Sequence, residues 1–359
     1  MRTIYSIIAA LLLICFMING PAEAQGESAV PFLLISPNSR ASGMGEFGTG
    51  IADDAAAIHW NPAGLAFQRG QEISITHTNW LPQFGMSDLF YDYINYRNHF
   101  NSLNGTFAAA ITYLNLGEHT RTSSLGPEPI GTFRSYEFAV TAGYATKIME
   151  NLGLGVNLRV IHSALSPIGT EQEEGSGVGT TVAGDIGVLY KTSVFDMPLS
   201  LGANLQNLGP KITYIDAAQA DPIPTNLRVG FALKLLESEA NTLTLGADFS
   251  RILVRRYEAP PGGETPQPDP FYKAIFTAWG DQGLKKVIIS GGLEYWYTDL
   301  IALRAGYFHE ERVAGGRKFL TFGAGLRYDI YGFDFSYIAT LEEDHPLSDT
   351  LRFTLLLSW

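Results

Sequence analysis

The chain has 359 residues, of which 46% are hydrophobic, 12% aromatic and only 17% charged, and its net charge is −12. The acidic charge argues against a nucleic-acid-binding protein, which needs clustered Lys and Arg to contact phosphates. The aromatic content argues against a disordered chain, and a single cysteine, Cys15, excludes a disulfide framework and a cysteine-based zinc site.

Residues 1–24 have the pattern of a signal peptide. Arg2 precedes an almost unbroken apolar run over residues 4–18, and the small-x-small sequence Ala-Glu-Ala follows at residues 22–24, which predicts cleavage before Gln25. A membrane-spanning helix is the competing interpretation, but the run is shorter than the about 20 residues that a bilayer requires. We therefore expect a secreted chain without cysteine.

Residues 25–70 are rich in Gly and Ala and lack the alternating pattern of the rest of the chain. Asp53 and Asp54, which precede a run of Ala, could start one short helix that Pro62 must end. Such a segment is too short to form a core of its own and too apolar for a tail. We therefore expect it to pack inside the structure that residues 71–359 form.

From residue 71 onward, apolar and polar residues alternate over stretches of about 9–12 residues. Near the C-terminus, for example, Leu351, Phe353 and Leu355 alternate with Arg352 and Thr354. A period of two places the apolar side chains on one face of a strand. Fourteen strands are predicted, at residues 71–78, 87–97, 105–116, 134–147, 152–165, 180–192, 199–208, 226–236, 242–253, 287–297, 301–309, 318–329, 332–341 and 349–359.

The length of these strands favours a membrane barrel over a soluble sandwich. Soluble strands average about 5–6 residues, whereas a tilted strand that crosses a bilayer needs about 9–11. Tight turns also alternate with long connections such as 116–134 and 253–287, as in outer-membrane barrels. Aromatic residues gather where the short-turn interface should lie, at Tyr144, Tyr190, Tyr295, Tyr297, Tyr328 and Trp359.

The predicted fold is therefore all-β: a 14-stranded antiparallel transmembrane β-barrel in the outer membrane of a Gram-negative-type (diderm) bacterium, with both termini in the periplasm. A barrel of this size is too wide for side chains alone to fill, so residues 25–70 are predicted to form a hatch in the lumen. Charges on the polar strand faces could pair across the wall or with the hatch, or could only solvate the lumen. They are Glu137, Arg159, Asp185, Arg228, Asp248, Glu294, Arg304, Arg327 and Asp334.

The longest predicted outer loop is rich in proline over residues 259–270 and continues with aromatic residues at helical spacing: Phe271, Tyr272, Phe276 and Trp279. A helix of this kind could dock on a partner or on lipid, and folding back over the lumen is an equally good interpretation. Trp80 and Phe84 mark a second apolar loop with the same alternatives.

A third predicted outer loop is acidic, with Glu171, Glu173 and Glu174. A divalent cation could bridge these residues to lipopolysaccharide, although a solvated loop is the simpler interpretation.

No pattern in the sequence indicates catalysis or the binding of a cofactor or metal. The Gly-x-Ser-x-Gly elbow of serine hydrolases is missing, and no His pair has the spacing of a zinc helix. His162 and Ser163 are adjacent, but neighbours on a strand point to opposite faces and cannot share a proton. We therefore expect a non-enzymatic protein.

Two motifs in the predicted hatch resemble the PorV/PorQ family: Ser39-Arg40-Ala41-Ser42-Gly43-Met44-Gly45 and Trp60-Asn61-Pro62-Ala63-Gly64-Leu65. The barrel segments 271–279, 293–297, 302–307 and 323–328 resemble PorV as well, so the likeness spans essentially the whole mature chain. The Asn-Pro-Ala-Gly-Leu motif alone is less specific, because the fatty acid channel FadL shares it.

This resemblance implies a FadL-like barrel with an N-terminal hatch. For PorV it further implies type IX protein secretion, in which the barrel captures cargo by a C-terminal signal domain at the translocon and delivers it to surface-attachment proteins. Its surroundings would be outer-membrane lipid and lipopolysaccharide. A FadL-like channel for hydrophobic small molecules is the alternative, and a purely structural barrel is a third, weaker hypothesis.

Overall fold

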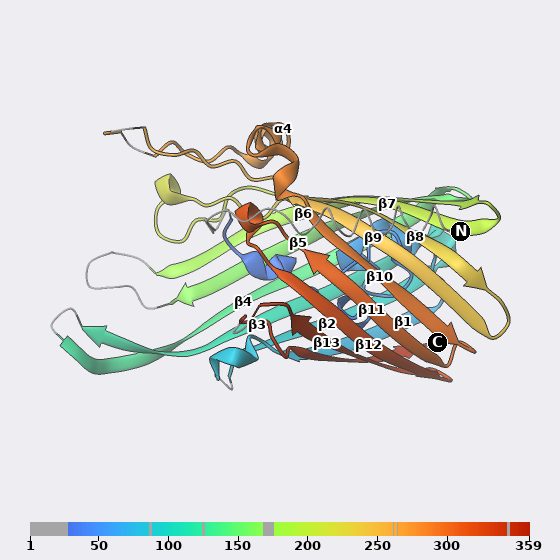
Figure 1. Cartoon of the computed structure of the whole chain (residues 1–359). Helices are drawn as coiled ribbons and strands as arrows, with labels where there is room; N and C mark the ends of the chain where they lie inside the picture. The colour runs from blue at the N-terminus through green and yellow to red at the C-terminus, as the bar shows by residue number, and fades with distance from the viewer. Residues whose placement is uncertain are drawn as a thin grey trace.

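The computed structural model describes residues 28–85, 88–123, 126–167, 176–260, 262–263, 265–342 and 345–359. The predicted signal peptide and the acidic residues Glu171, Glu173 and Glu174 lie outside them. In the described part, fourteen antiparallel strands close into a barrel in which sequence neighbours pair and the first strand pairs with the last (Figure 1). The predicted fold class is confirmed. None of the helices described is long and apolar enough to cross a membrane.

The strands agree closely with the alternating segments of the sequence. They are β1 (Gln71–Asn79), β2 (Phe90–Phe100), β3 (Gly105–Ser123), β4 (Gly126–Met149), β5 (Leu152–Ser166), β6 (Gly177–Val194), β7 (Met197–Leu208), β8 (Asn226–Glu237), β9 (Asn241–Ile252), β10 (Ile288–Tyr297), β11 (Ile301–His309), β12 (Lys318–Tyr328), β13 (Tyr331–Thr340) and β14 (Leu351–Ser358). On β14, Arg352 and Thr354 are buried in the lumen while Leu355 is exposed on the outer face. A polar interior and an apolar exterior are the arrangement that lipid requires.

The segment predicted as a long connection over 116–134 is instead strand. β3 and β4 continue to Ser123 and from Gly126, with a bulge between Asn115 and Glu118 at which Gly117 has a φ of 84°. β2 pairs with β3 only as far as Asn115, so the outer parts of β3 and β4 form a two-stranded ribbon that projects past the barrel (Figure 1). The bulge and the glycines interrupt the alternation, which hid this ribbon from the sequence pattern.

The remaining short elements lie in the hatch and in the connections. The hatch contains η1 (Pro31–Leu34), α2 (Ser39–Ser42), α3 (Ala57–Trp60) and η2 (Pro62–Phe67), and α3 ends just before Pro62. The connections hold η3 (Pro82–Phe84), η4 (Asn101–Leu103), η5 (Ala217–Gln219), α4 (Phe271–Thr277), η6 (Ala278–Gly280), η7 (Gly283–Lys286) and η8 (Arg312–Ala314).

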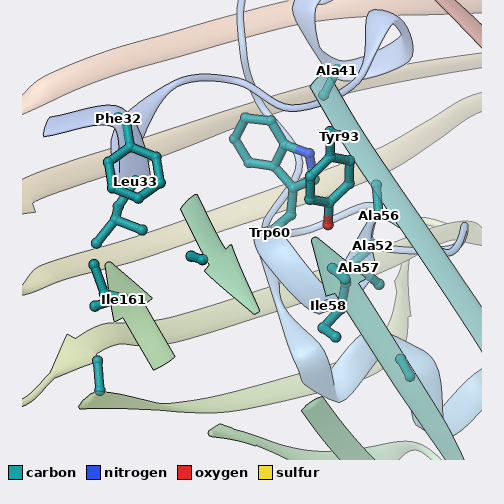
Figure 2. Packing of buried hydrophobic residues seen from close by; sticks show 14 of the residues in the cluster. Phe32, Leu33, Ala41, Ala52, Ala56, Ala57, Ile58, Trp60, Tyr93 and Ile161 are labelled. Carbon is teal, nitrogen blue, oxygen red and sulfur yellow. The ribbon is translucent and has the colours of Figure 1, made fainter. Parts of the chain in front are cut away.

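The hatch fills the lumen as the core of the molecule. Phe32, Ile58 and Trp60 are buried against inward-facing wall residues such as Tyr93 and Ile161 (Figure 2). Contacts of this kind supply the apolar core that the segment cannot form by itself.

The hatch also crosses the barrel lengthwise. Ala29 N–H donates to Pro222 O in the long β7–β8 connection (3.0 Å), whereas Gln71, where the hatch joins β1, pairs with Trp359 at the short-turn end. The first and last described residues therefore lie towards opposite ends of the barrel. The predicted mature N-terminus, Gln25, lies outside the described residues, so the placement of both termini in the periplasm stays a prediction.

Candidate functional site

The first hatch motif is fastened to the wall by Arg40 on α2. Its Nε and Nη2 donate to Glu294 Oε2 and Oε1 on β10 at 2.8 and 2.7 Å, and its Nη1 contacts Asp53 and Asp54 of the hatch. Although burial lowers the pKa of Arg40, the carboxylates of Asp53 and Glu294 outweigh it and raise that pKa. The guanidinium therefore keeps its charge and ties two parts of the hatch to one strand.

The same network runs on through the wall. Arg304 on β11 donates to Glu294 and to Asp334 (both 2.7 Å), and Arg327 on β12 contacts Asp334 at 2.6 Å. Four of the predicted lumen charges thus form one chain that ends on Arg40. Charged pairs with this much hydrogen bonding can tolerate burial, since each carboxylate oxygen has a donor.

The Gly-Met-Gly part of the first motif lies flat on the wall. A Cβ added to Gly292 on β10 would meet Met44 O at 2.6 Å, and one added to Gly43 would meet the Cα of Gly323 on β12 at 3.0 Å. Gly45 adopts a φ of 73° and donates its N–H to Thr321 Oγ1 at 2.8 Å. Backbone can approach this closely only where side chains are missing on both surfaces.

A buried carboxylate on β9 holds the next hatch turn. Asp248 Oδ2 accepts from the N–H groups of Gly48 and Thr49 (2.9 Å each) and from Thr49 Oγ1 (2.7 Å). On β8, Arg228 stacks its guanidinium over the Trp60 ring at 5.0 Å and donates to Gln206. Two more lumen charges therefore face the hatch.

The second hatch motif, residues 60–65, packs against β5 and β6. The Asn61 amide donates to Thr49 O and Val188 O (3.1 and 3.0 Å), and its Oδ1 accepts from Ala63 N–H (3.1 Å). Pro62 packs where a side chain on Gly155 or Gly187 would clash. Ser39, Trp60, Ala63, Gly64 and Leu65 are buried.

Three wall amides were missed in the sequence analysis. Asn157 on β5 and Asn204 on β7 donate to the carbonyls of Ile58 and Trp60 (2.7 and 3.0 Å), and Gln206 donates to that of His59. They satisfy carbonyls at the end of α3 that would otherwise lack partners. Their place on the inward face of alternating strands is the signal that could have identified them.

The other predicted lumen charges do not bind the hatch directly. Arg159 on β5 pairs with Asp185 on β6 at 2.9 Å, and Asp185 also accepts from Asn157. Glu137 on β4 accepts from Ser163 at 2.8 Å. These contacts brace neighbouring strands.

Near Trp60, His59 is buried beside Arg228 and Arg159, and burial together with these two cations lowers its pKa well below the usual value. His59 is therefore neutral at physiological pH. Among the described residues, no group of three or more His, Cys, Asp or Glu could hold a metal ion.

The residues of the two apolar loops lie at the long-connection end. Trp80 is half-buried and packs on the inward cluster that includes Phe319 and Ile338, with its ring 5.9 Å from the guanidinium of Arg352. Phe84 is exposed. The other apolar loop contains α4, which carries Phe271, Tyr272 and Phe276 and lies outside the outline of the barrel (Figure 1).

Residues 23–259 match the family model described as type IX secretion system protein PorV. The chain belongs to the PorV family. Its membership and its barrel make it an outer-membrane protein of type IX secretion, in a family without known catalysis. No functionally curated protein matches the chain.

Solved structures share the fold at low sequence identity. The toluene transporter TbuX of Ralstonia pickettii is 14% identical with a TM-score of 0.52, over 89% of this chain and 97% of that one. The toluene transporter TodX of Pseudomonas putida is 13% identical with a TM-score of 0.53, over 89% and 96%. This PorV-family chain therefore has the barrel architecture of those transporters.

Proposed function

We propose that this protein is a barrel closed by its hatch that binds secreted proteins at its outer end and hands them to surface-attachment proteins during type IX secretion. The observation that carries the proposal is the seat of the hatch. From the hatch, Asn61 and Pro62 contact β5 and β6. From the wall, four side chains bind the hatch: Asn157 on β5, Asn204 on β7, Asp248 on β9 and Glu294 on β10.

A hatch bound on so many sides favours surface binding over transport through the lumen. Further contacts reach β12 and β14 through Thr321 and Thr354, and Ala55 N–H donates to Glu72 on β1. Moving the hatch would leave buried carboxylates and carbonyls without hydrogen-bond partners, and each unsatisfied group would cost about 1–3 kcal/mol of free energy. Between Phe32, Ile58, Tyr93 and their neighbours the free space is only about 10 Å³, which is roughly one water. A larger pocket of about 530 Å³, lined by Arg40 and Glu294, lies beside the hatch towards the short turns.

In this proposal the short turns face the periplasm and the long connections face outward. The β3–β4 ribbon then stands in water beyond the membrane. Its outer strand edges pair with no further strand in the described part of the chain, and side chains such as Ile130 are exposed. We assign it the first contact with the C-terminal domain of a cargo protein. Translocon and attachment proteins would meet the same outer end.

Complementation of a deletion strain tests the proposal. The wild-type gene should restore cargo display at the cell surface, whereas a gene with the ribbon shortened should insert its barrel but fail to restore display. Normal display in the deletion strain would refute the role in secretion.

A channel for hydrophobic solutes is the second candidate, and the shared fold of the toluene transporters favours it. It requires the hatch to move. Solute uptake by liposomes that contain the purified protein, at a rate well above that of empty liposomes, would support the channel and count against a closed carrier.

A further inference from the structure

Arg251 occupies an unusual position on β9. Inward-facing Asp248 and Ser250 set the alternation, so Arg251 points outward with Phe249, towards the lipid side of the wall. Its side chain is nevertheless buried. Nη2 donates to the carbonyls of Ala278 and Asp281 at 2.6 and 2.9 Å, and the guanidinium lies 5.0 Å from the Trp279 ring.

The β9–β10 connection therefore folds over the rim and down the outer side of the barrel. Nη1 of Arg251 also donates to Gly283 O, so η6 and η7 both rest on this one side chain. Figure 1 shows α4 outside the outline of the barrel rather than across its mouth. The interpretation in which this helix folds back over the lumen does not fit this arrangement.

The connection is held in a fixed shape. Asp269 accepts from Tyr257 Oη and Thr277 Oγ1 (2.8 Å each) and from Lys273 Nζ (2.7 Å). Arg255 pairs with Asp281 at 3.2 Å. The apolar residues of this segment are thus presented by a framework of polar contacts.

The outer side of this framework is strongly apolar. Ala274 and Ala278 are buried against the protein, whereas Tyr272, Phe276 and Leu284 expose 65%, 76% and 79% of their surface. Exposed apolar patches of this kind mark a membrane or a protein interface. We call Tyr272, Phe276, Trp279 and Leu284 the lateral patch.

We propose that the lateral patch inserts into the outer leaflet of the membrane and anchors the long-connection end of the barrel in lipid. The patch continues the lipid-facing wall, because Trp279 covers Arg251, which follows Phe249 on the outward face of β9. Exposed Lys285 next to Leu284 can contact the phosphates of lipid headgroups. The inference needs only a membrane barrel and is independent of the proposed secretion role.

The depth of Arg251 agrees with this placement. It lies eight residues along β9 from Leu243, another outward residue near the short-turn end. Eight residues span about 26 Å along a strand, or about 20 Å along the membrane normal at the usual tilt, close to the edge of an apolar band about 25 Å tall. A protein partner would have to reach this flank from within the membrane.

Site-specific fluorescence tests the proposal. In the mature protein, whose sequence from Gln25 onward contains no cysteine, Phe276→Cys is labelled with the environment-sensitive dye NBD, and the protein is reconstituted into liposomes of phospholipid and lipopolysaccharide. We expect blue-shifted emission and loss of most of the intensity when lipids carry a doxyl quencher. Leu355→Cys, on the wall, is the lipid-facing control, and Ile130→Cys, on the ribbon, is the water-facing control.

An Arg251→Ala variant tests whether the hydrogen bonds from Arg251 to the β9–β10 connection set the position of the lateral patch. The dye at residue 276 should then lose much of its quenching while the barrel stays folded, as judged by its heat-modifiable migration on gels. Arg134→Ala, which changes an exposed ribbon arginine, should leave the quenching unchanged. Emission at residue 276 that matches the ribbon control and resists the quencher would overturn the proposal and leave the patch available to a protein.

Discussion

Arg40 and Glu294 form a two-pronged ion pair between the hatch and the barrel wall, with Nε to Oε2 at 2.8 Å and Nη2 to Oε1 at 2.7 Å. Glu294 also accepts from Arg304 at 2.7 Å, so one buried carboxylate faces two guanidinium groups. Glu294 is therefore the central residue of the polar contacts that hold the hatch to the wall.

Removing Glu294 should therefore cost more stability than removing Arg40. Glu294→Gln removes the carboxylate that two buried cations share and leaves them only Asp53, Asp54 and Asp334, whereas Arg40→Gln leaves Glu294 still paired with Arg304. Breaking a buried pair of this kind lowers the free energy of unfolding by about 3–5 kcal/mol. Thermal unfolding in detergent is followed by tryptophan fluorescence. The unfolding temperature should be highest for the wild type, lower for Arg40→Gln and lowest for Glu294→Gln. The reverse order of the two variants would show that Glu294 is not the central residue of these contacts.

Two adjacent glycines on β10 test the close packing of the hatch. An added Cβ at Gly292 meets Met44 O at 2.6 Å, whereas at Gly291 the nearest atom is Gly246 O at 3.5 Å. Gly292→Ala should destabilise the protein by about 1–3 kcal/mol and make the hatch accessible to protease, because the Met44 backbone must move. Gly291→Ala should be close to neutral. Equal behaviour of the two variants would mean that the hatch does not rest on this surface.

The hatch should respond to pH through Asp54. Burial, with the charges of Glu72 and Asp53, raises the pKa of Asp54 from 3.8 to about 6 despite the opposing charge of Arg40. Between these pH values the folded protein binds more protons than the unfolded chain, so this residue's contribution to stability falls as the pH rises from about 4 to 6 and then levels off.

Asp54→Asn should remove the fall in stability that the titration of Asp54 causes. The variant should gain on the wild type as the pH rises from 4 to 7, by a difference of the order of 2 kcal/mol. Chemical unfolding at several pH values measures the two slopes. Parallel slopes for variant and wild type would show that Asp54 has an ordinary pKa in the fold.

The ribbon should be dispensable for the barrel. Replacing residues 118–134 with a tight turn removes strand pairs that, among the described residues, β3 and β4 make only with each other. We expect unchanged unfolding of the barrel and loss of binding to a purified cargo C-terminal domain, measured by co-purification. Retained binding would move the contact to another outer connection.

The barrel could be predicted from the sequence, whereas the seat of the hatch could not. The alternation of Leu351 to Leu355 determines which face of β14 meets lipid, and it depends only on neighbours along the chain. The pairing of Arg40 with Glu294 joins residues 254 positions apart and depends on the register of the closed sheet. Likewise, a charged Arg251 on the lipid face breaks the local pattern, and only the carbonyls that fold onto it explain its place.

The central claim is that the hatch closes the lumen, and conductance across a planar bilayer tests it most directly. The wild-type protein should insert without opening a stable pore, whereas a variant lacking residues 28–68 should conduct ions steadily through the emptied barrel. Steady conductance by the wild type, equal to that of the variant, would contradict the account.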